Sequence, residues 1–312
     1  QVTNVTSALA GQVAGVQLVS ANGAPGSNPT IRIRGISSIN AGNSPLIIVD
    51  GTPYDGDMNN ISPSDIENMT VLKDAASNSL YGARGANGVI MITTKNAKKG
   101  QAVVTVDAKY GVNTNALRKY NVLTDPRAYY EQHYKALYNY YTAEDGLGLS
   151  AAAAYLKANN SINDAAAGGL GYEIFNVPAG EMLIGRNGKV NPGATLGNVL
   201  GDFYVIPDDW GENAYRNGIR QEYTLGISGA EDRLSYYTSI SYLDNQGITE
   251  KSDHERLTAR IKGTYQAKDW LKVGTNMSYA RFNFNSLGND GNDSSTANIW
   301  AYVSQMAPVY PL

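Results

Sequence analysis

The chain has 312 residues, of which 42% are hydrophobic and 17% are charged, and its formal net charge is -3. This charge, with no basic cluster beyond Lys95, Lys98 and Lys99, excludes a nucleic-acid-binding surface, and the lack of cysteine excludes a disulfide framework and a thiolate metal site. Tyrosine dominates the aromatic residues, at 22 against 4 Phe, which suits strands that end at a water interface and equally a large soluble β-protein.

The first part of the chain, residues 1–97, predicts one small α+β domain. Ile31 and Ile33 share one face of a strand, and Arg32 and Arg34 share the other. Asp50-Gly51 follows a continuous apolar run and predicts a tight turn, in which glycine supplies a positive φ. The predicted elements, in chain order, are a helix at 4–9, strands at 13–20, 31–34 and 46–49, a helix beginning at Ser62, a strand at 70–73, a helical piece at 75–81 and a strand at 89–94.

From Gln101 onward the hydrophobic period is two, which indicates strands with one apolar and one polar face. Each of these runs has about 9–12 residues, the length that a tilted strand needs to cross a bilayer. No run approaches the ~20 apolar residues of a membrane-spanning helix. If the chain crosses a membrane, it must therefore cross with β-strands. The alternation assigns Leu225, Ile227, Ile261 and Val273 to the lipid face, and Arg260, Lys262 and Asn276 to the opposite face.

The connections between these strands alternate in length. The turns at 229–232 and 267–269 are short, whereas the loops 113–220 and 244–255 are long. Outer-membrane barrels combine tight periplasmic turns with extended outer loops. The alternation of short and long connections therefore favours a membrane barrel over a soluble sandwich. Residues 98–312 are therefore predicted to be the N-terminal antiparallel strands of a transmembrane β-barrel. About five strands cannot close a barrel, and we expect both ends of the chain to be cut.

The long loop 113–220 is predicted to have structure of its own. Asp125-Pro126 opens a helix with a stripe of tyrosines, and residues 151–158 are expected to form a second helix. The tyrosine stripe is either a binding surface for sugars or peptides or a face packed on neighbouring loops. A later polar stretch, 207–210, carries an aromatic anchor and is expected to lie outside the membrane, near a substrate or a partner.

Enzymatic and metal sites find little support in the sequence. The only histidines are His133 and His254, in a predicted helix and an outer loop, so no His-dependent triad or multi-histidine zinc site can be assembled. Adjacent carboxylates such as Asp208 and Asp209 rarely give the separation that a glycosidase requires. Four aspartates lie in predicted loops but lack the spacing of a defined calcium-binding loop: Asp55, Asp57, Asp290 and Asp293. They either bind calcium or are solvated turn residues. We therefore predict no catalysis, cofactor or metal.

Four segments resemble the SusC/RagA family of TonB-dependent transporters. They are IRIRG at 31–35, PLIIVDGTP at 45–53, SPSDIENMTVLKDAASNSLYGARGANGVIMITTK at 62–95 and QEYTLGISGA at 221–230. The resemblance implies a plug domain inside a bacterial outer-membrane barrel of on the order of twenty strands. It also implies energy from the inner-membrane TonB complex, reached through a segment that these residues lack, and a SusD-like surface lipoprotein as a lid.

The implied function is TonB-dependent active import of oligosaccharides or oligopeptides through the outer membrane, in contact with its lipids. The alternative is a non-transporting surface receptor or adhesin on the same scaffold. Arg32 and Arg34 either bond to carboxylates on the barrel wall and release them on gating, or form an ordinary solvated pair. Lys73, Asp74, Arg84 and Glu67 are expected to form an internal charge network. The candidates for plug gating or anchoring are Arg32, Arg34, Asp50, Gly51, Lys73, Asp74 and Arg84, and those for facing substrate or lid are Tyr134, Tyr138, Asp208, Asp209 and Trp210.

Overall fold

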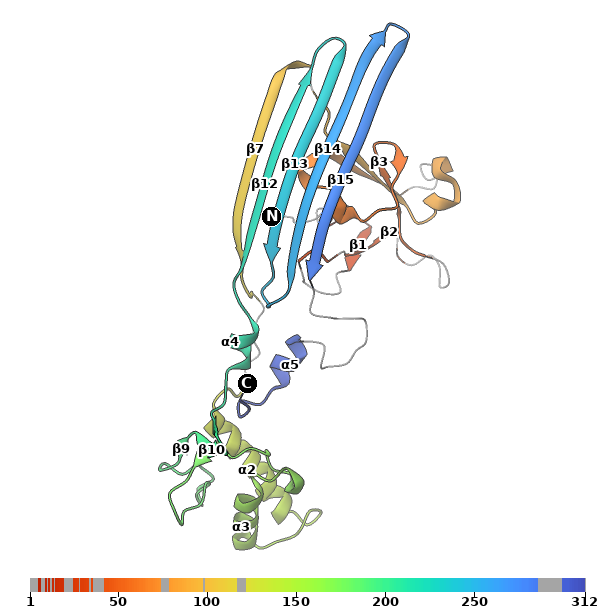
Figure 1. Cartoon of the computed structure of the whole chain (residues 1–312). Helices are drawn as coiled ribbons and strands as arrows, with labels where there is room; N and C mark the ends of the chain where they lie inside the picture. The colour runs from red at the N-terminus through yellow and green to blue at the C-terminus, as the bar shows by residue number, and fades with distance from the viewer. Residues whose placement is uncertain are drawn as a thin grey trace. The chain divides into compact units, whose positions relative to one another are not determined.

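The structure is a computed structural model of the chain, which forms two compact units, Gln1–Asn115 with Arg216–Gly288 and Ala116–Tyr215 with Asn289–Leu312. The first unit contains an N-terminal domain and a sheet of five long strands, and the second contains the long insertion (Figure 1). Among the described residues, no helix has the length and apolar character needed to cross a membrane. The description covers every residue except 1–4, 7, 8, 10, 12, 14, 20–24, 28, 34, 36–41, 74–78, 98, 117–121, 286–298 and 312.

The N-terminal domain is built on a four-stranded sheet of order β4-β3-β6-β5, with a separate antiparallel pair, β1-β2. Strands β3 and β6 run parallel, and the outer pairs are antiparallel. A core of aliphatic side chains, including Ile31, Ile33, Ile90 and Ile92, holds the two sheets together. The elements are β1 Val16–Val19, β2 Thr30–Ile33, β3 Leu46–Val49, β4 Thr52–Pro53, the 3₁₀ helices η2 Met58–Asn60 and η3 Pro63–Asp65, β5 Ile66–Leu72, the 3₁₀ helix η4 Ser79–Gly85, and β6 Val89–Thr94.

The predicted helix beginning at Ser62 is wrong beyond its first turn. Residues Pro63–Asp65 form a single 3₁₀ turn, and the chain continues directly into β5. The β5 segment IENMTVL pairs with β6 from Ile66 to Leu72, so sheet pairing overrides the helix signal of Ser62 and Pro63. Strands β2, β3 and β6 lie within a residue of their predicted positions, whereas the predicted helices at 4–9 and 75–81 fall partly outside the described residues.

The five long strands form one antiparallel sheet of order β15-β14-β13-β12-β7, which we call the wall. The wall strands have 13 to 16 residues and are longer than predicted. Their polar ends continue to pair, as Asn245 does with His254, and the loop between β13 and β14 shrinks to 247–252. The strands are β7 Gly100–Asn113, β12 Gly218–Ala230, β13 Leu234–Gln246, β14 Asp253–Lys268 and β15 Leu271–Asn285.

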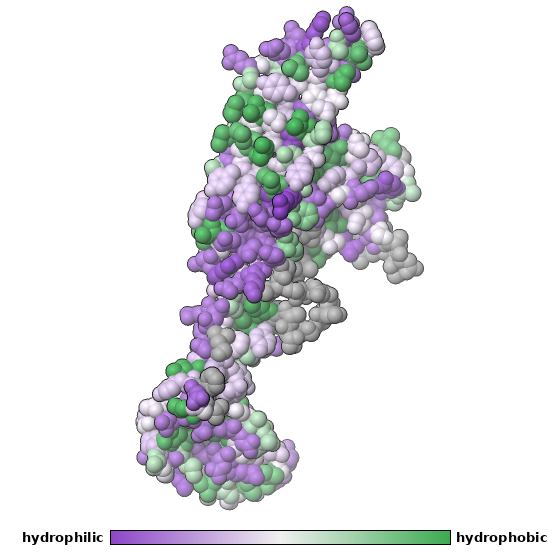
Figure 2. Space-filling model, in the orientation of Figure 1, coloured by the Kyte–Doolittle hydropathy of each residue, from purple (hydrophilic) through white to green (hydrophobic). Residues whose placement is uncertain are grey.

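The two faces of the wall differ in chemistry. Side chains alternate along each strand, and Leu225, Ile261 and Val273 are 42%, 55% and 55% exposed on the outer face. On the inner face Ser239 and Arg260 are buried. In Figure 2 hydrophobic side chains gather in a band across the sheet, between mostly hydrophilic upper tips and the hydrophilic lower ends of its strands. An apolar outer band and a polar inner face are the pattern of a transmembrane β-barrel.

The second unit packs around helix α2, whose N-terminus is fixed by Asp125. The Asp125 carboxylate accepts hydrogen bonds from the backbone N–H groups of Arg127 and Ala128, and Pro126 occupies the first turn. Tyrosines of α2 pack against Ala154 and Ala158 of α3. The elements of this unit are α2 Pro126–Thr142, α3 Ala151–Ser161, the 3₁₀ helix η5 Ala165–Ala167, β8 Phe175–Asn176, β9 Thr195–Leu196, β10 Asn198–Leu200, β11 Phe203–Val205, α4 Trp210–Ala214 and α5 Ile299–Gln305.

Candidate functional site

The turn between β3 and β4 places Asp50 against the wall. Asp50 and Gly51 have φ angles of 49° and 83°, which is the left-handed backbone that a two-residue Asp-Gly hairpin adopts. The Asp50 N–H donates to the carbonyl of Ile92 at 2.9 Å and anchors the turn on β6. The backbone of the turn is thus fixed by the domain, and the carboxylate is free to bind groups around it.

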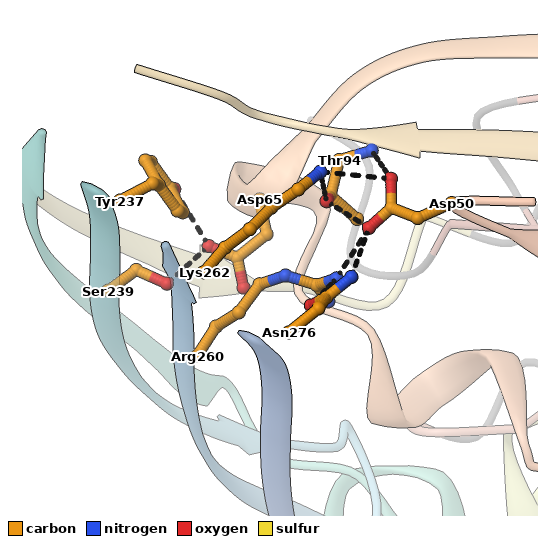
Figure 3. Close-up of polar contacts among 8 residues, drawn as sticks. All are labelled: Asp50, Asp65, Thr94, Tyr237, Ser239, Arg260, Lys262 and Asn276. Carbon is orange, nitrogen blue, oxygen red and sulfur yellow. Dashed lines mark hydrogen bonds and ion pairs between the residues drawn. The ribbon is translucent and has the colours of Figure 1, made fainter. Parts of the chain in front are cut away.

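The Asp50 carboxylate joins the end of β6 to two wall strands (Figure 3). Thr94 donates its backbone N–H at 2.9 Å and its hydroxyl at 2.6 Å. From the wall, Arg260 Nη2 and Asn276 Nδ2 both donate to Oδ2 at 2.8 Å, and Lys262 Nζ lies 3.4 Å from Oδ1. We call these five residues the Asp50 cluster.

The Asp50 cluster is a largely buried ion pair, since the Arg260 and Asp50 side chains are 7% and 11% exposed. Burial by itself raises the pKa of Asp50, but the hydrogen bonds from Thr94 and Asn276 and the charge of Lys262 outweigh it and lower that pKa to about 2. Asp50 is therefore ionised at any ordinary pH. A buried carboxylate with these partners is held firmly, because removing one partner leaves the other charge uncompensated.

A second carboxylate, Asp65 at the end of η3, also contacts the wall. Its Oδ1 accepts hydrogen bonds from the hydroxyls of Tyr237 at 3.0 Å and Ser239 at 2.6 Å, both on β13 (Figure 3). The Asp65 carbonyl accepts from the N–H of Lys95 at 2.8 Å, which ties η3 to the end of β6. Asp65 thus receives neutral donors from the wall, whereas Asp50 receives cationic ones.

A third contact lies closer to the loop that joins β13 and β14. Arg256 is 1% exposed, and its Nη1 donates to the carbonyl of Asn59 at 3.0 Å. Asn59 in turn donates to the carbonyl of Gly26 at 2.7 Å. Gly26 packs on His254 so closely that a Cβ added there would lie 2.7 Å from the imidazole ring. This contact therefore depends both on hydrogen bonds and on the close approach of the Gly26 backbone to the wall.

The structure does not bring the predicted gating residues together at one site. Asp50 reaches the wall, and Gly51 completes its turn. Arg84 pairs with Asp55 at 2.8 Å on the domain surface, where their side chains are 58% and 81% exposed. Lys73 follows the end of β5, Arg32 is half-buried on β2, and Arg34 and Asp74 lie outside the described residues.

The polarity of the contact differs from the sequence expectation. We expected cations on the domain and carboxylates on the wall. Between described residues, the structure instead shows domain carboxylates, Asp50 and Asp65, facing donors on the wall. None of the ion pairs between described residues includes Arg32, and its gating role stays a prediction.

The candidates for facing substrate or lid have internal partners in the second unit. Tyr134 is 6% exposed in the core, and Tyr138 stacks on it with ring centroids 6.0 Å apart. Asp209 caps α4 by accepting from the N–H groups of Gly211 and Glu212, and the Trp210 indole donates to the Tyr310 carbonyl at 3.1 Å. The Asp208 N–H also donates to that carbonyl, at 3.3 Å. These contacts favour packing as the role of the tyrosine stripe.

Several residues of the plug–wall contact were not among the site candidates of the sequence reasoning, including Asp65, Tyr237, Arg256, Arg260 and Asn276. The period-two pattern does assign the two arginines and Asn276 to the polar face of their strands. It cannot identify the domain residue opposite each of them, since Asp50 and Arg260 are 210 positions apart in the chain.

Comparisons with known proteins agree with this architecture. A family model described as TonB-dependent Receptor Plug Domain matches residues 1–89. The chain is 30% identical over 270 residues to the TonB-dependent receptor SusC of Bacteroides thetaiotaomicron, covering 83% of this chain and 21% of SusC. It is 29% identical over 269 residues to the TonB-dependent receptor P39 of Formosa agariphila, covering 86% of this chain and 21% of P39. The chain thus spans about a fifth of the length of these relatives, 21% in each case.

Solved structures give the same result. The RagAB peptide importer in its closed-closed state is similar over 99% of this chain and 32% of that chain, with a TM-score of 0.69 and 27% identity. The siderophore receptor PirA from Acinetobacter baumannii shares the fold, with a TM-score of 0.51 and 18% identity. These relatives are receptors and importers, which confirms the prediction that the chain is not an enzyme. The chain belongs to the SusC/RagA-like TonB-dependent receptors of the bacterial outer membrane, of which it comprises the plug domain and the first strands of the barrel.

Proposed function

We propose that the protein containing this chain actively imports oligosaccharides or oligopeptides across the outer membrane. Residues 1–97 act as the plug, and 98–312 supply barrel strands and the outer loops, which the strand bounds place at 114–217 and 247–252. The observation that carries the proposal is the Asp50 cluster, a buried ion pair between plug and wall. Cargo cannot pass until such contacts break, and breaking them requires work.

The source of that work is proposed to be the TonB complex. The outer membrane has no ATP supply and no ion gradient of its own, so the pull must come from the inner membrane. The relatives SusC and P39 are named TonB-dependent receptors, which supports this assignment. We propose that the TonB complex acts on the intact protein through a TonB-binding segment.

A SusD-like surface lipoprotein is the proposed partner on the outer side. The RagAB peptide importer has been solved in a closed-closed and an open-open state, and the chain matches both, with TM-scores of 0.69 and 0.66. The two named states belong to that importer, and we propose a corresponding opening and closing of a lid over the outer loops of this protein. Asp208, Asp209 and Trp210, on the second unit, are the proposed residues nearest to cargo or lid.

The test uses the full-length protein in cells. Deleting the TonB-binding segment is expected to abolish uptake of a labelled cargo while leaving its binding to the cell surface nearly unchanged. Collapsing the proton motive force in cells with the intact protein is expected to have the same effect. Undiminished uptake in either experiment shows a passive pore. Surface binding without any uptake by the intact protein favours the alternative, a receptor or adhesin on the same scaffold.

A further inference from the structure

The inner face of the wall is rich in cationic side chains. Arg256, Arg260 and Lys262 follow one another on the inner face of β14, at every second or fourth residue. Arg220 on β12 and Lys109 on β7 extend the row across the sheet, because both contact Glu222, at 2.8 Å and 3.8 Å. Basic side chains therefore line the part of the wall that the plug covers.

Carboxylates on this surface are too few to neutralise these cations. The inner-face carboxylates that contact the row are Glu222 and Asp107, the latter 3.4 Å from Lys109. Five cations against two carboxylates leave an excess of three positive charges on the strands. The plug contributes two more carboxylates, Asp50, which pairs with Arg260, and Asp65, which accepts from hydroxyls, so five cations on the wall face four carboxylates in all.

Several of the buried guanidinium groups also have donors without an acceptor. Within the described structure, Nε of Arg220, Arg256 and Arg260 and Nη2 of Arg256 have no hydrogen-bond partner. These arginines are 8%, 1% and 6% exposed. Arg256 takes part in none of the ion pairs between described residues, and a backbone carbonyl is the acceptor of its Nη1. Buried, incompletely paired cations are costly for stability, so the plugged state alone does not explain them.

We propose that four cations of this row, Arg220, Arg256, Arg260 and Lys262, form a binding track for anionic cargo that opens when the plug moves. The inference rests on the proposed function and specifies its cargo as oligomers that carry carboxylate groups. Rings or rows of Arg and Lys select anions in pores, because the low-dielectric wall focuses their field on the lumen.

The track also explains why Asp50 is the plug residue at this position. In the plugged state the Asp50 carboxylate binds Arg260 and Lys262 as a cargo carboxylate would. When the plug withdraws, both cations lose their partner and become binding groups for the next carboxylate to arrive. Cargo without negative charge offers no such replacement, and its passage leaves the cations uncompensated.

The test measures the ion selectivity of the opened pore in the full-length protein. Asp50→Asn opens a leak while keeping the wall cations, and the wild type in moderate urea provides a second way to displace the plug. In a KCl gradient, the reversal potential is expected to show chloride preferred over potassium by roughly threefold or more. Adding Arg256→Gln, Arg260→Gln and Lys262→Gln is expected to bring the ratio close to unity. A matched control, Arg281→Gln on the outer face of β15, is expected to leave it unchanged.

Competition for uptake then separates the two sources of carboxylate. A glutamate-bearing oligopeptide is compared with its glutamine counterpart, and an oligogalacturonate with its methyl ester. Preference for the acidic member, lost in the triple Gln variant, supports the track for that class of cargo. A non-selective pore, selectivity that the wall substitutions do not change, or preference for the neutral members overturns it. Uptake that does not depend on the proton motive force overturns the proposal of active import. It leaves the measured ion selectivity of the pore unaffected.

Discussion

Asp50 combines two properties that few residues offer together. Its φ of 49° lies in the left-handed region, which Asp and Asn tolerate better than other non-glycine residues. Its short side chain also places a carboxylate within 2.8 Å of donors on two wall strands. A β-branched residue would strain the backbone of this turn.

Replacing Asp50 by Asn tests the charge of this residue without changing its shape. The variant leaves Arg260 buried without a counter-charge, which is expected to weaken plug docking by about 3–5 kcal/mol. Single-channel conductance of the full-length protein is expected to show leaks of small ions. The matched control is Asp55→Asn, because Asp55 pairs with Arg84 at an exposed site, where an ion pair contributes at most about 1 kcal/mol. Equal conductance in both variants contradicts the anchoring role of Asp50.

The same residue predicts how plug docking depends on pH. Its pKa falls from 3.8 to about 2 in the plugged structure, so the ionised form favours docking. This contribution is fully present above about pH 4 and is lost as the pH falls toward 2. We expect the leak of the wild-type protein to rise over this acidic window, whereas the leak of Asp50→Asn stays flat there. A wild-type leak that is constant between pH 4 and pH 2 contradicts this linkage.

At the scale of an element, the alternation of β14 makes neighbouring residues respond differently. Ile261 is 55% exposed on the outer face, while Lys262 contacts Asp50 and Thr94 on the inner face. Ile261→Arg near the middle of the membrane is expected to cost about 2–4 kcal/mol in a folding titration of the full-length barrel. Lys262→Ala is expected to change barrel folding little and to loosen the plug. An equal loss of folding free energy in the two variants refutes the assignment of Ile261 to the outer face and Lys262 to the inner face.

Helix α2 makes a similar distinction between two tyrosines. Tyr130 is fully buried, packs edge-to-face on Phe175 and donates its hydroxyl to the Tyr172 carbonyl, whereas Tyr140 is 56% exposed. Tyr130→Ala is expected to destabilise the insertion by about 3–5 kcal/mol through the cavity it leaves. Limited proteolysis of the full-length protein is expected to cut the insertion faster in this variant than in Tyr140→Ala. Equal cleavage of the two variants shows that α2 does not depend on this core.

The sequence predicts the periodic elements well and the long-range contacts poorly. The wall strands and β3 show a clear period or a continuous apolar run, so their positions and faces follow from local pattern. The helix predicted at Ser62 fails because β5 pairs with β6, and the partners in this pairing are 17 to 28 positions apart in the chain. The Asp50 cluster depends on contacts between residues 44 to 226 positions apart, and no local signal encodes such pairing.

At the scale of the whole molecule, import requires that plug segments leave the wall. The contact of Asp65 with Ser239, 2.6 Å between their side-chain oxygens, provides a direct test. These 312 residues contain no cysteine, so Asp65→Cys with Ser239→Cys introduces the only thiol pair among them. Oxidising this pair in the full-length protein is expected to block uptake, and reduction is expected to restore it. Each single variant serves as a control, and uptake by the cross-linked protein shows that η3 stays in place while cargo passes.

The short connection between β6 and β7 has a consequence for how the plug returns. Thr94, a member of the Asp50 cluster, is separated from the first wall residue, Gly100, by five residues, a span of about 20 Å when fully extended. The end of β6 therefore stays tethered beside the wall throughout any opening. Tethering keeps the effective concentration of Thr94 and its neighbours near Lys262 high. Once the pull ceases, the Asp50 cluster re-forms by an intramolecular reaction, so closing the pore needs no second input of energy.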